Sequence, residues 1–210
     1  MTHAGLLAAV LFTFACASSS PERASAPTPA PDSAALAAAA PRASITAREQ
    51  YYDIDGSSAG ALRHQIGRLG PKDESGKSRD ALTAWSLEWG YGTTQRGDSC
   101  VLRDVKVTLD VALTLPRWKP PATASAELLK TWQAYFKAVR LHEAGHRTIA
   151  ERNARELVAA LTPLRGASCQ KLADEATRTA ERIVADGRAR NRAYDIQTKH
   201  GQTQGVELGP

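Results

Sequence analysis

His142-Glu143-Ala144-Gly145-His146 places two histidines four residues apart, with a glutamate directly after the first. On an α-helix, residues four apart lie about 40° from each other around the axis and about 6 Å along it. Both imidazoles therefore project from one face and can bind one metal ion, while the Glu143 carboxylate lies on an adjoining face. This H-E-x-x-H spacing is typical of zinc hydrolases, in which the glutamate is the general base.

The sequence around the motif predicts one long helix over residues 125–161. Ser125 provides an N-cap, and Pro163 and Gly166 follow the helix end. Apolar residues recur at spacings of three and four, namely Leu128, Leu129, Trp132, Tyr135, Phe136, Val139, Ile149, Leu157, Val158 and Leu161. The motif therefore lies in the middle of a helix, where its geometry is defined.

A catalytic zinc takes three protein ligands and a water, so the two histidines need a partner. A second helix, predicted over residues 168–193, should run back antiparallel to the first and bring the segment after it beside His142. We therefore predict His200, in that segment, as the third ligand; the alternative is a solvent-exposed histidine of the tail. The other candidates for the third ligand are Glu175 and Glu181 of the second helix, and Asp195.

The residues just before His200 are candidates for supporting roles. Asp195 would orient a ligand histidine by accepting its other N–H, and Tyr194 would support the oxyanion. Glu143 would take a proton from the water that zinc activates for attack on an amide, and would deliver it to the leaving amine.

The rest of the chain predicts a small sheet ahead of the long helix. A short strand over 50–55 precedes a helix over 61–69, and alternating apolar residues predict strands over 83–91 and 101–115. The three glycines in 90–98 suggest the hairpin connection. We therefore expect an α+β, zincin-like fold, in which a small antiparallel sheet precedes the active-site helix and an antiparallel second helix. Its edge strand could pair with an extended peptide.

The front of the chain predicts export. Residues 6–15 are apolar and end at Cys16, which indicates a signal segment (1–16) with lipoprotein-type cleavage; the alternatives are ordinary signal cleavage and a misplaced start. Residues 17–43 are rich in Ala, Pro and Ser and read as a flexible tether, which leaves one domain over 44–210. The protein would lie in the periplasm, or on the outer membrane through a lipid on Cys16.

The cysteines and charges fit this reading. If Cys16 is acylated, Cys100 and Cys169 remain, and an even pair in an exported chain favours a disulfide over two buried thiols. The net charge of +5 is dispersed, and the arginines of the second helix alternate with acidic residues. A solvated helix face is therefore expected rather than nucleic-acid binding, with contact to an anionic membrane or cell-wall polymer as an alternative.

The motif and the downstream segment Tyr194-Asp195-x-x-Thr198-x-His200-Gly201-x-x-Gln204-Gly205 together resemble a family of bacterial secreted proteins. The family is described as predicted zinc-dependent proteases and is otherwise a domain of unknown function. The resemblance extends over most of the mature chain and takes in Tyr51-Tyr52-Asp53, Gly70-Pro71, Trp85, Trp89, Leu115-Pro116-x-Trp118, Cys100 and Cys169. It implies a zincin-like fold and supports His200 and Asp195 as site residues.

The sequence thus predicts a zinc metalloprotease of the bacterial cell envelope. His142, His146 and His200 would hold Zn²⁺, and the substrate would be a peptide or protein, including cell-wall peptides. Two alternatives remain. One is an envelope protein that zinc stabilises without catalysis, and the other is a module that binds peptide or cell wall.

Overall fold

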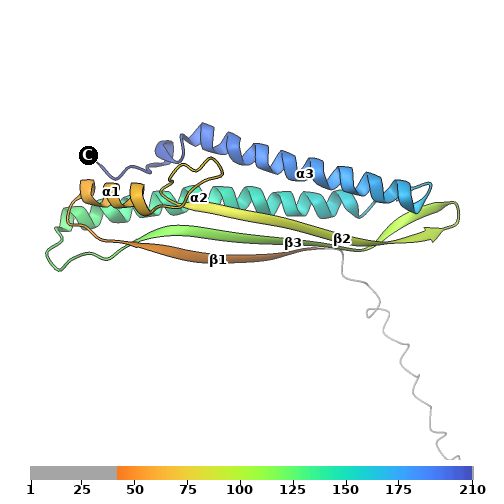
Figure 1. Ribbon diagram of the computed structural model, residues 1–210, viewed down its shortest axis with the longest axis horizontal. Coiled ribbons are helices and arrows are strands. Elements are labelled where there is room, and N and C mark those ends of the chain that lie inside the picture. Colours follow the sequence, from red (N-terminus) through yellow and green to blue (C-terminus); the bar gives the residue numbers. More distant parts are fainter. Residues whose placement is uncertain (1–41, 210) are drawn as a thin grey trace, which may run out of the picture. The chain divides into compact units, whose positions relative to one another are not determined.

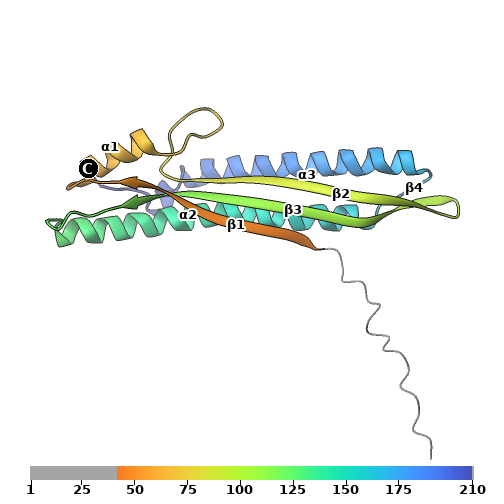
Figure 2. The same cartoon turned by 60° about the horizontal axis from the view of Figure 1, so that its bottom comes forward.

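The computed structural model describes residues 42–209 (Figure 1), so the predicted signal segment, Cys16 and nearly all of the tether lie outside the described residues. The described part confirms the α+β class, with one sheet and two long helices along one of its faces (Figures 1 and 2). The strands are β1 (Ala43–Ile54), β2 (Leu82–Arg96), β3 (Ser99–Trp118) and β4 (Arg165–Gly166). The helices are α1 (Ala59–Leu69), α2 (Ala126–Leu161) and α3 (Cys169–Thr198), followed by a 3-10 turn, η2 (Gln202–Gln204).

The sheet is mixed, which corrects the prediction of an antiparallel sheet. Its strand order is β1-β3-β2; β2 pairs antiparallel with β3, whereas β1 pairs parallel with it. The end of β1 and the start of β2 lie at the same end of the sheet, because Ile54 is opposite Trp118 and Leu82 is opposite Thr114. The segment containing α1 carries the chain from one side of β3 to the other, which makes β1 parallel to β3.

The β2–β3 hairpin is longer than predicted. We expected a connection over 90–98, but β2 continues to Arg96 and the turn is limited to Gly97 and Asp98. Gly97 has a φ of 57°, in the left-handed region that glycine adopts without steric cost. The register shifts between Gly90 and Gly92, so these glycines form an irregularity within the strand pair and do not end it.

Alternate residues of β3 face the helices and build the core. The main cluster combines β3 side chains with small and branched residues of α2 and α3: Val107, Leu109, Val111, Leu113, Ala150, Ala154, Leu157, Leu172, Ala176 and Ala180. A second cluster lies at the α1 end and contains Ile54, Leu62, Ile66, Leu115, Trp118, Leu128, Tyr135, Val139 and Leu208. The motif lies on α2 between the residues that enter these two clusters, so both cores hold the helix at the site.

The long helix agrees with its prediction, whereas α3 does not end where we expected. The Ser125 hydroxyl accepts a hydrogen bond from the Leu128 amide at 3.1 Å, as an N-cap does. We expected α3 to end at 193, but it continues to Thr198 and stops where Lys199 turns left-handed. No glycine or proline occurs between 188 and 200 to end it earlier. Tyr194 and Asp195 therefore lie on the helix and not in a segment that leaves it.

The predicted disulfide is present and joins Cys100 of β3 to Cys169 at the start of α3.

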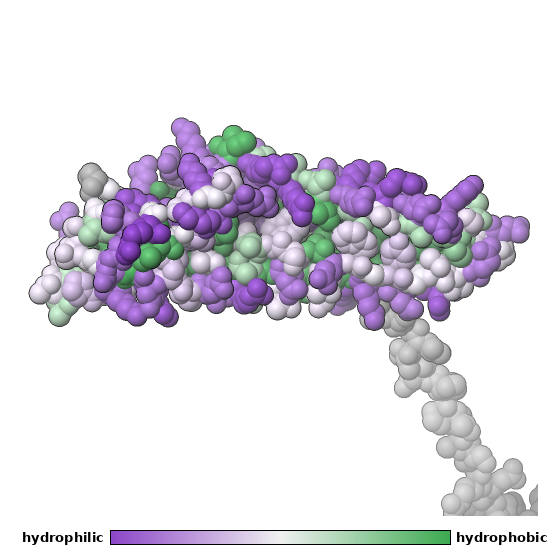
Figure 3. All heavy atoms as spheres, in the orientation of Figure 1, coloured by the Kyte–Doolittle hydropathy of each residue, from purple (hydrophilic) through white to green (hydrophobic). Residues whose placement is uncertain are grey.

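Hydrophilic side chains cover most of the face in Figure 3. Two of the α3 arginines pair with glutamates, Arg178 with Glu175 and Arg190 with Glu156. None of the helices between residues 42 and 209 is long and apolar enough to cross a bilayer.

Candidate metal centre

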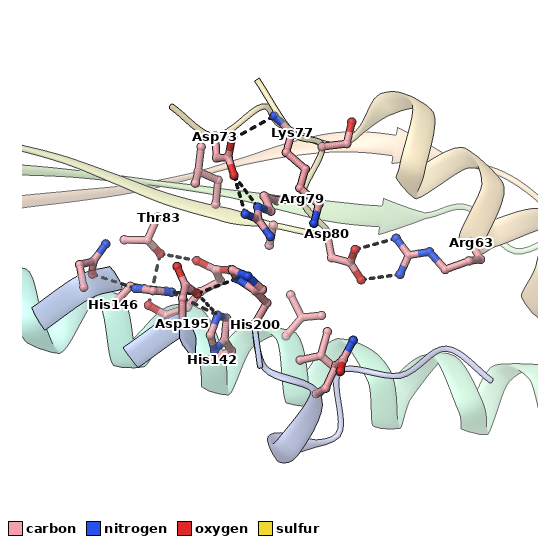
Figure 4. A pocket seen from close by; sticks show the side chains of 18 residues that line it. Arg63, Asp73, Lys77, Arg79, Asp80, Thr83, His142, His146, Asp195 and His200 are labelled. Carbon is pink, nitrogen blue, oxygen red and sulfur yellow. Dashed lines mark hydrogen bonds and ion pairs between the residues drawn. The ribbon is translucent and has the colours of Figure 1, made fainter. Parts of the chain in front are cut away.

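The two histidines of α2 lie on one buried face, as their spacing predicts. Each is only 6 % exposed, and their Nε2 atoms are 3.1 Å apart. The side chains point away from the helix axis into the space between α2, α3 and the start of β2 (Figure 4). One ion could therefore contact both imidazoles.

Asp195 of α3 completes a triangle of ligand atoms. Its Oδ1 lies 3.3 Å from His142 Nε2 and 3.2 Å from His146 Nε2. Ligands at about 2.0–2.1 Å from a tetrahedral zinc are separated by about 3.3–3.4 Å. Within residues 42–209, these three residues form the group of His, Cys, Asp and Glu side chains close enough to share a metal. The residues present therefore fit a zinc ion.

The far side of each imidazole is held by an amide. His142 Nδ1 lies 2.9 Å from Gln204 Oε1, and His146 Nδ1 lies 2.8 Å from Asn191 Oδ1. The Gln204 amide is oriented by its own N–H, which donates to the Tyr194 hydroxyl at 3.0 Å. Because amide oxygens only accept, both Nδ1 atoms carry the hydrogen and both Nε2 atoms present lone pairs. Two imidazole lone pairs and one carboxylate oxygen therefore converge on one point, which is the arrangement that binds a cation.

Tyr194 lies behind the site. Its ring stacks on His142 at 5.1 Å between centroids and meets His146 edge-on at 4.9 Å. Its hydroxyl lies 3.3 Å from the His142 carbonyl oxygen, and Tyr194 does not line the cavity. The ring fits because Gly145 has no side chain: a Cβ there would lie 2.1 Å from the Tyr194 hydroxyl oxygen. The motif thus needs glycine as its fourth residue in this fold.

Glu143 is buried beside the histidines, only 4 % exposed, and lines the same cavity. The Thr83 hydroxyl of β2 donates to Glu143 Oε2 at 2.7 Å. Burial raises the pKa of Glu143, and the Thr83 hydrogen bond and the nearby histidines only partly offset this effect. No local pattern of the sequence predicts the contact between Thr83 and Glu143, because 60 residues separate them.

A cavity of about 300 Å³ opens in front of these groups (Figure 4). His200, the predicted third ligand, lines it with its side chain 47 % exposed and its Nδ1 3.3 Å from Asp195 Oδ1. The structure therefore places His200 beside Asp195 and favours Asp195 as the third ligand. Neither alternative glutamate, Glu175 or Glu181, lines the cavity.

The electrostatics of the site follow from this packing. Burial alone would raise the pKa of Asp195, but its hydrogen bonds with His142 and His146 outweigh burial and hold that pKa well below its usual range. Burial would lower the pKa of His146, yet its hydrogen bonds with Asp195 and Asn191, together with the Glu143 charge, raise it. At a pH below the raised pKa of His146, a proton between His146 and Asp195 would therefore occupy the place that a metal cation would take.

Residues 49–201 match a family described as bacterial proteins of unknown function (DUF922), which covers well over half of the chain. The chain belongs to this family. The match agrees with the resemblance to a bacterial domain of unknown function and assigns no activity to it. Searches of curated proteins and of solved structures returned no significant match.

The family region contains the three candidate ligands and Glu143, but it ends at Gly201, just before the residues that hold His142. Residues 199–208 form a C-terminal hook that starts with three successive left-handed residues, with φ of 49° at Lys199, 55° at His200 and 85° at Gly201. The hook returns Gln204 to His142 and ends with Leu208 in the second core cluster. The sequence motif included Gln204, but only the fold shows what it contacts.

Proposed function

We propose that this protein is a zinc-dependent hydrolase with a zincin-like site, and that it cleaves peptide bonds. The observation that carries the proposal is the triangle formed by His142 Nε2, His146 Nε2 and Asp195 Oδ1, with sides of 3.1–3.3 Å. The amides of Asn191 and Gln204 aim both imidazoles at its centre. Such a site, beside a buried glutamate and an open cavity, is the arrangement that metal-assisted hydrolysis requires.

The chain's own residues would perform the proton transfers. When bound, zinc would polarise the scissile carbonyl and acidify the attacking water. Glu143 would accept the proton from that water and pass it to the leaving amine, a role that suits a carboxylate whose pKa is raised toward neutrality. Thr83 would keep the carboxylate oriented, because its hydroxyl holds Oε2.

Two roles expected from the sequence change in this proposal. Asp195 becomes a metal ligand, and His200 takes the supporting place beside it, with its Nδ1 3.3 Å from Asp195 Oδ1. Tyr194 becomes a positioning residue: it packs against both histidines and faces the α2 backbone, whereas an oxyanion would form in the cavity.

The proposed location is the bacterial cell envelope. The Cys100–Cys169 disulfide supports export, because such bonds persist in oxidising compartments and are rare in the cytosol. A peptide or protein of the periplasm, or a cell-wall peptide, would then be the substrate. The lipid on Cys16 belongs to the same proposal.

One observation favours a second candidate, a zinc site that only stabilises the fold. His200 lies next to Asp195 at the cavity wall, and a small movement could make it a fourth ligand that closes the site. Zinc would then staple α2 to α3 and leave no position for water.

Metal content and hydrolysis in the full chain separate these candidates. We expect about one zinc per chain by mass spectrometry in the wild type and in His200→Ala. Asp195→Ala should weaken zinc binding by more than the about 10- to 100-fold typical of losing an outer partner, with Asp186→Ala on the same helix as the control. Glu143→Gln should keep zinc but lose peptide hydrolysis by about 10²-fold or more. Loss of zinc in His200→Ala, together with an inactive wild type, would support the stabilising site; a wild type that binds no zinc would overturn both.

A further inference from the structure

The wall of the cavity opposite the metal centre is a loop that the proposed chemistry does not use. It connects α1 to β2 and contributes Asp73, Lys77, Arg79 and Asp80 to the lining. Figure 4 shows these side chains across the cavity from His142, His146 and Asp195. A substrate bound at the metal centre would therefore lie against this loop.

Asp73 organises the loop and neutralises Arg79. Its Oδ1 accepts hydrogen bonds from the Ser75 amide at 2.9 Å, the Ser75 hydroxyl at 2.6 Å and the Lys77 amide at 3.0 Å. Its Oδ2 accepts from Arg79 Nε at 2.7 Å. Both carboxylate oxygens are engaged, so Asp73 has little capacity left for another cation.

Asp80 is engaged in the same way. Arg63 of α1 donates to both of its carboxylate oxygens, each at 2.6 Å, and the Tyr135 hydroxyl of α2 adds a bond of 2.8 Å to Oδ2. The Tyr52 hydroxyl also donates to the Asp80 carbonyl oxygen at 2.6 Å. The bidentate pair with Arg63 therefore neutralises the charge of Asp80. Together, the contacts of Asp80 with Arg63 and Tyr135 attach the loop to α1 and α2.

Within the described loop, Lys77 is the one cation lining the cavity that neither Asp73 nor Asp80 pairs with. Its side chain extends from the loop into the cavity (Figure 4). Among the salt bridges between described residues, Arg63 and Arg79 each have an aspartate, and Lys77 has none within 4.0 Å. The loop, held by the bonds of Asp73 and Asp80, thus presents an ammonium group that has no carboxylate of the described residues within 4.0 Å toward a substrate at the metal centre.

We propose that Lys77 binds a carboxylate of the substrate, and that the site cleaves short peptides close to their C-terminus. This inference rests on the proposed peptidase function. The cavity volume of about 300 Å³ agrees with it, because such a volume is at the lower end for small-ligand sites and suits a terminal residue better than a long segment. An acidic side chain beside the scissile bond would offer the same carboxylate chemistry, so the test must separate these two sources.

The test compares three peptides with the zinc-loaded full chain: one with a free C-terminal carboxylate, its C-terminal amide, and the amide with glutamate as the last residue. We expect kcat/KM for the free carboxylate to exceed that for the neutral amide by about tenfold or more. Lys77→Met should remove this preference. Lys72→Met is the matched control, because Lys72 lies on the same loop, bonds Ser78 and does not line the cavity.

A preference that follows the glutamate and not the terminus would keep the carboxylate contact but overturn the C-terminal assignment. Equal rates on all three peptides, or an unchanged preference in Lys77→Met, would overturn the contact itself. Binding gives a second readout: an amino-acid hydroxamate with a free carboxylate should bind about tenfold more tightly than its carboxamide in wild type and in Lys72→Met, and equally in Lys77→Met. If zinc binds and no peptide is cleaved, the peptidase function fails. The binding of the two hydroxamates, measured by calorimetry, still decides the role of Lys77 in that case.

Discussion

Gly145 shows at the scale of a single residue how closely α3 approaches the metal centre. In an exposed helix interior, Gly→Ala stabilises by about 0.5–1 kcal/mol. At Gly145 the new Cβ would lie 2.1 Å from the Tyr194 hydroxyl oxygen, so the ring or α3 must move. We expect Gly145→Ala to lower the free energy of unfolding by about 1–3 kcal/mol and to weaken zinc binding, because Tyr194 would no longer support both imidazoles.

The matched control for that substitution is Gly67→Ala in α1, where an added Cβ meets nothing within 4 Å. Urea unfolding of the zinc-free protein should show a gain for Gly67→Ala and a loss for Gly145→Ala. A gain at both positions would mean that α3 does not pack against the motif as described.

The proton in the metal-free site gives a pH prediction with a definite sign. Because the folded pKa of His146 is raised above 6.5, its contribution to stability is present below pH 6.5 and lost as pH rises through the raised value. Because the pKa of Asp195 is lowered from 3.8, its contribution is present above pH 3.8 and lost as pH falls through the folded value. Interaction between His146 and Asp195 thus stabilises the zinc-free domain most between pH 3.8 and pH 6.5.

Zinc must displace that proton, so its apparent affinity should rise with pH. We expect the apparent Kd to fall about tenfold per pH unit below the raised pKa of His146, and to level off above it. Competition titrations with a chelator of known affinity at several pH values measure this slope. A flat profile between pH 5.5 and 8 would contradict a site built on His146.

At the scale of elements, the sequence predicted what local signals determine. The cap at Ser125 and the apolar spacing of α2 lie within that helix, and they located it correctly. The predicted end of α3 was wrong by five residues. The helix ends after Thr198 because Lys199 and His200 adopt left-handed conformations, and lysine and histidine do not indicate such a turn in a sequence. Because α3 continues past 193, Asp195 lies on the helix beside the two histidines, in the position expected for His200. The contact of Thr83 with Glu143 depends on β2 packing against α2, which no local pattern encodes.

The conformation of the C-terminal hook should affect zinc binding, because the hook places Gln204 against His142. Gly201→Ala would place a Cβ 2.5 Å from Val206 and 3.1 Å from the His142 ring, at a φ of 85°. We expect the hook to open, Gln204 to leave His142, and zinc affinity to fall about 10- to 100-fold. Gly205→Ala is the control, because its φ of 93° imposes a similar backbone strain but its Cβ would make only an ordinary contact at 3.6 Å. Equal effects of both substitutions on zinc binding would show that strain alone, and not the loss of Gln204, is responsible.

At the scale of the whole described domain, α3 is attached to the rest of the fold at both of its ends. The Cys100–Cys169 disulfide fixes its first residue to β3, and Asp195 meets the histidines of α2 near its last turn. The two attachments are 26 residues apart (195 − 169), or about 39 Å along a helix. At such a distance, the effects of two changes on stability should be nearly additive.

Reduction of the disulfide should therefore destabilise the domain without emptying the metal centre. The bond closes a loop with a sequence separation of 69 residues, for which the chain-entropy relation gives about 4 kcal/mol as an upper estimate. We expect the Cys100→Ala/Cys169→Ala double variant to unfold at lower temperature than wild type and to keep its zinc stoichiometry and affinity in the folded state. Calorimetric unfolding and metal titration of both proteins measure the two effects. If zinc affinity fell together with stability, the position of Asp195 would depend on the far end of α3, and the helix would dock as a single unit and not through two independent attachments.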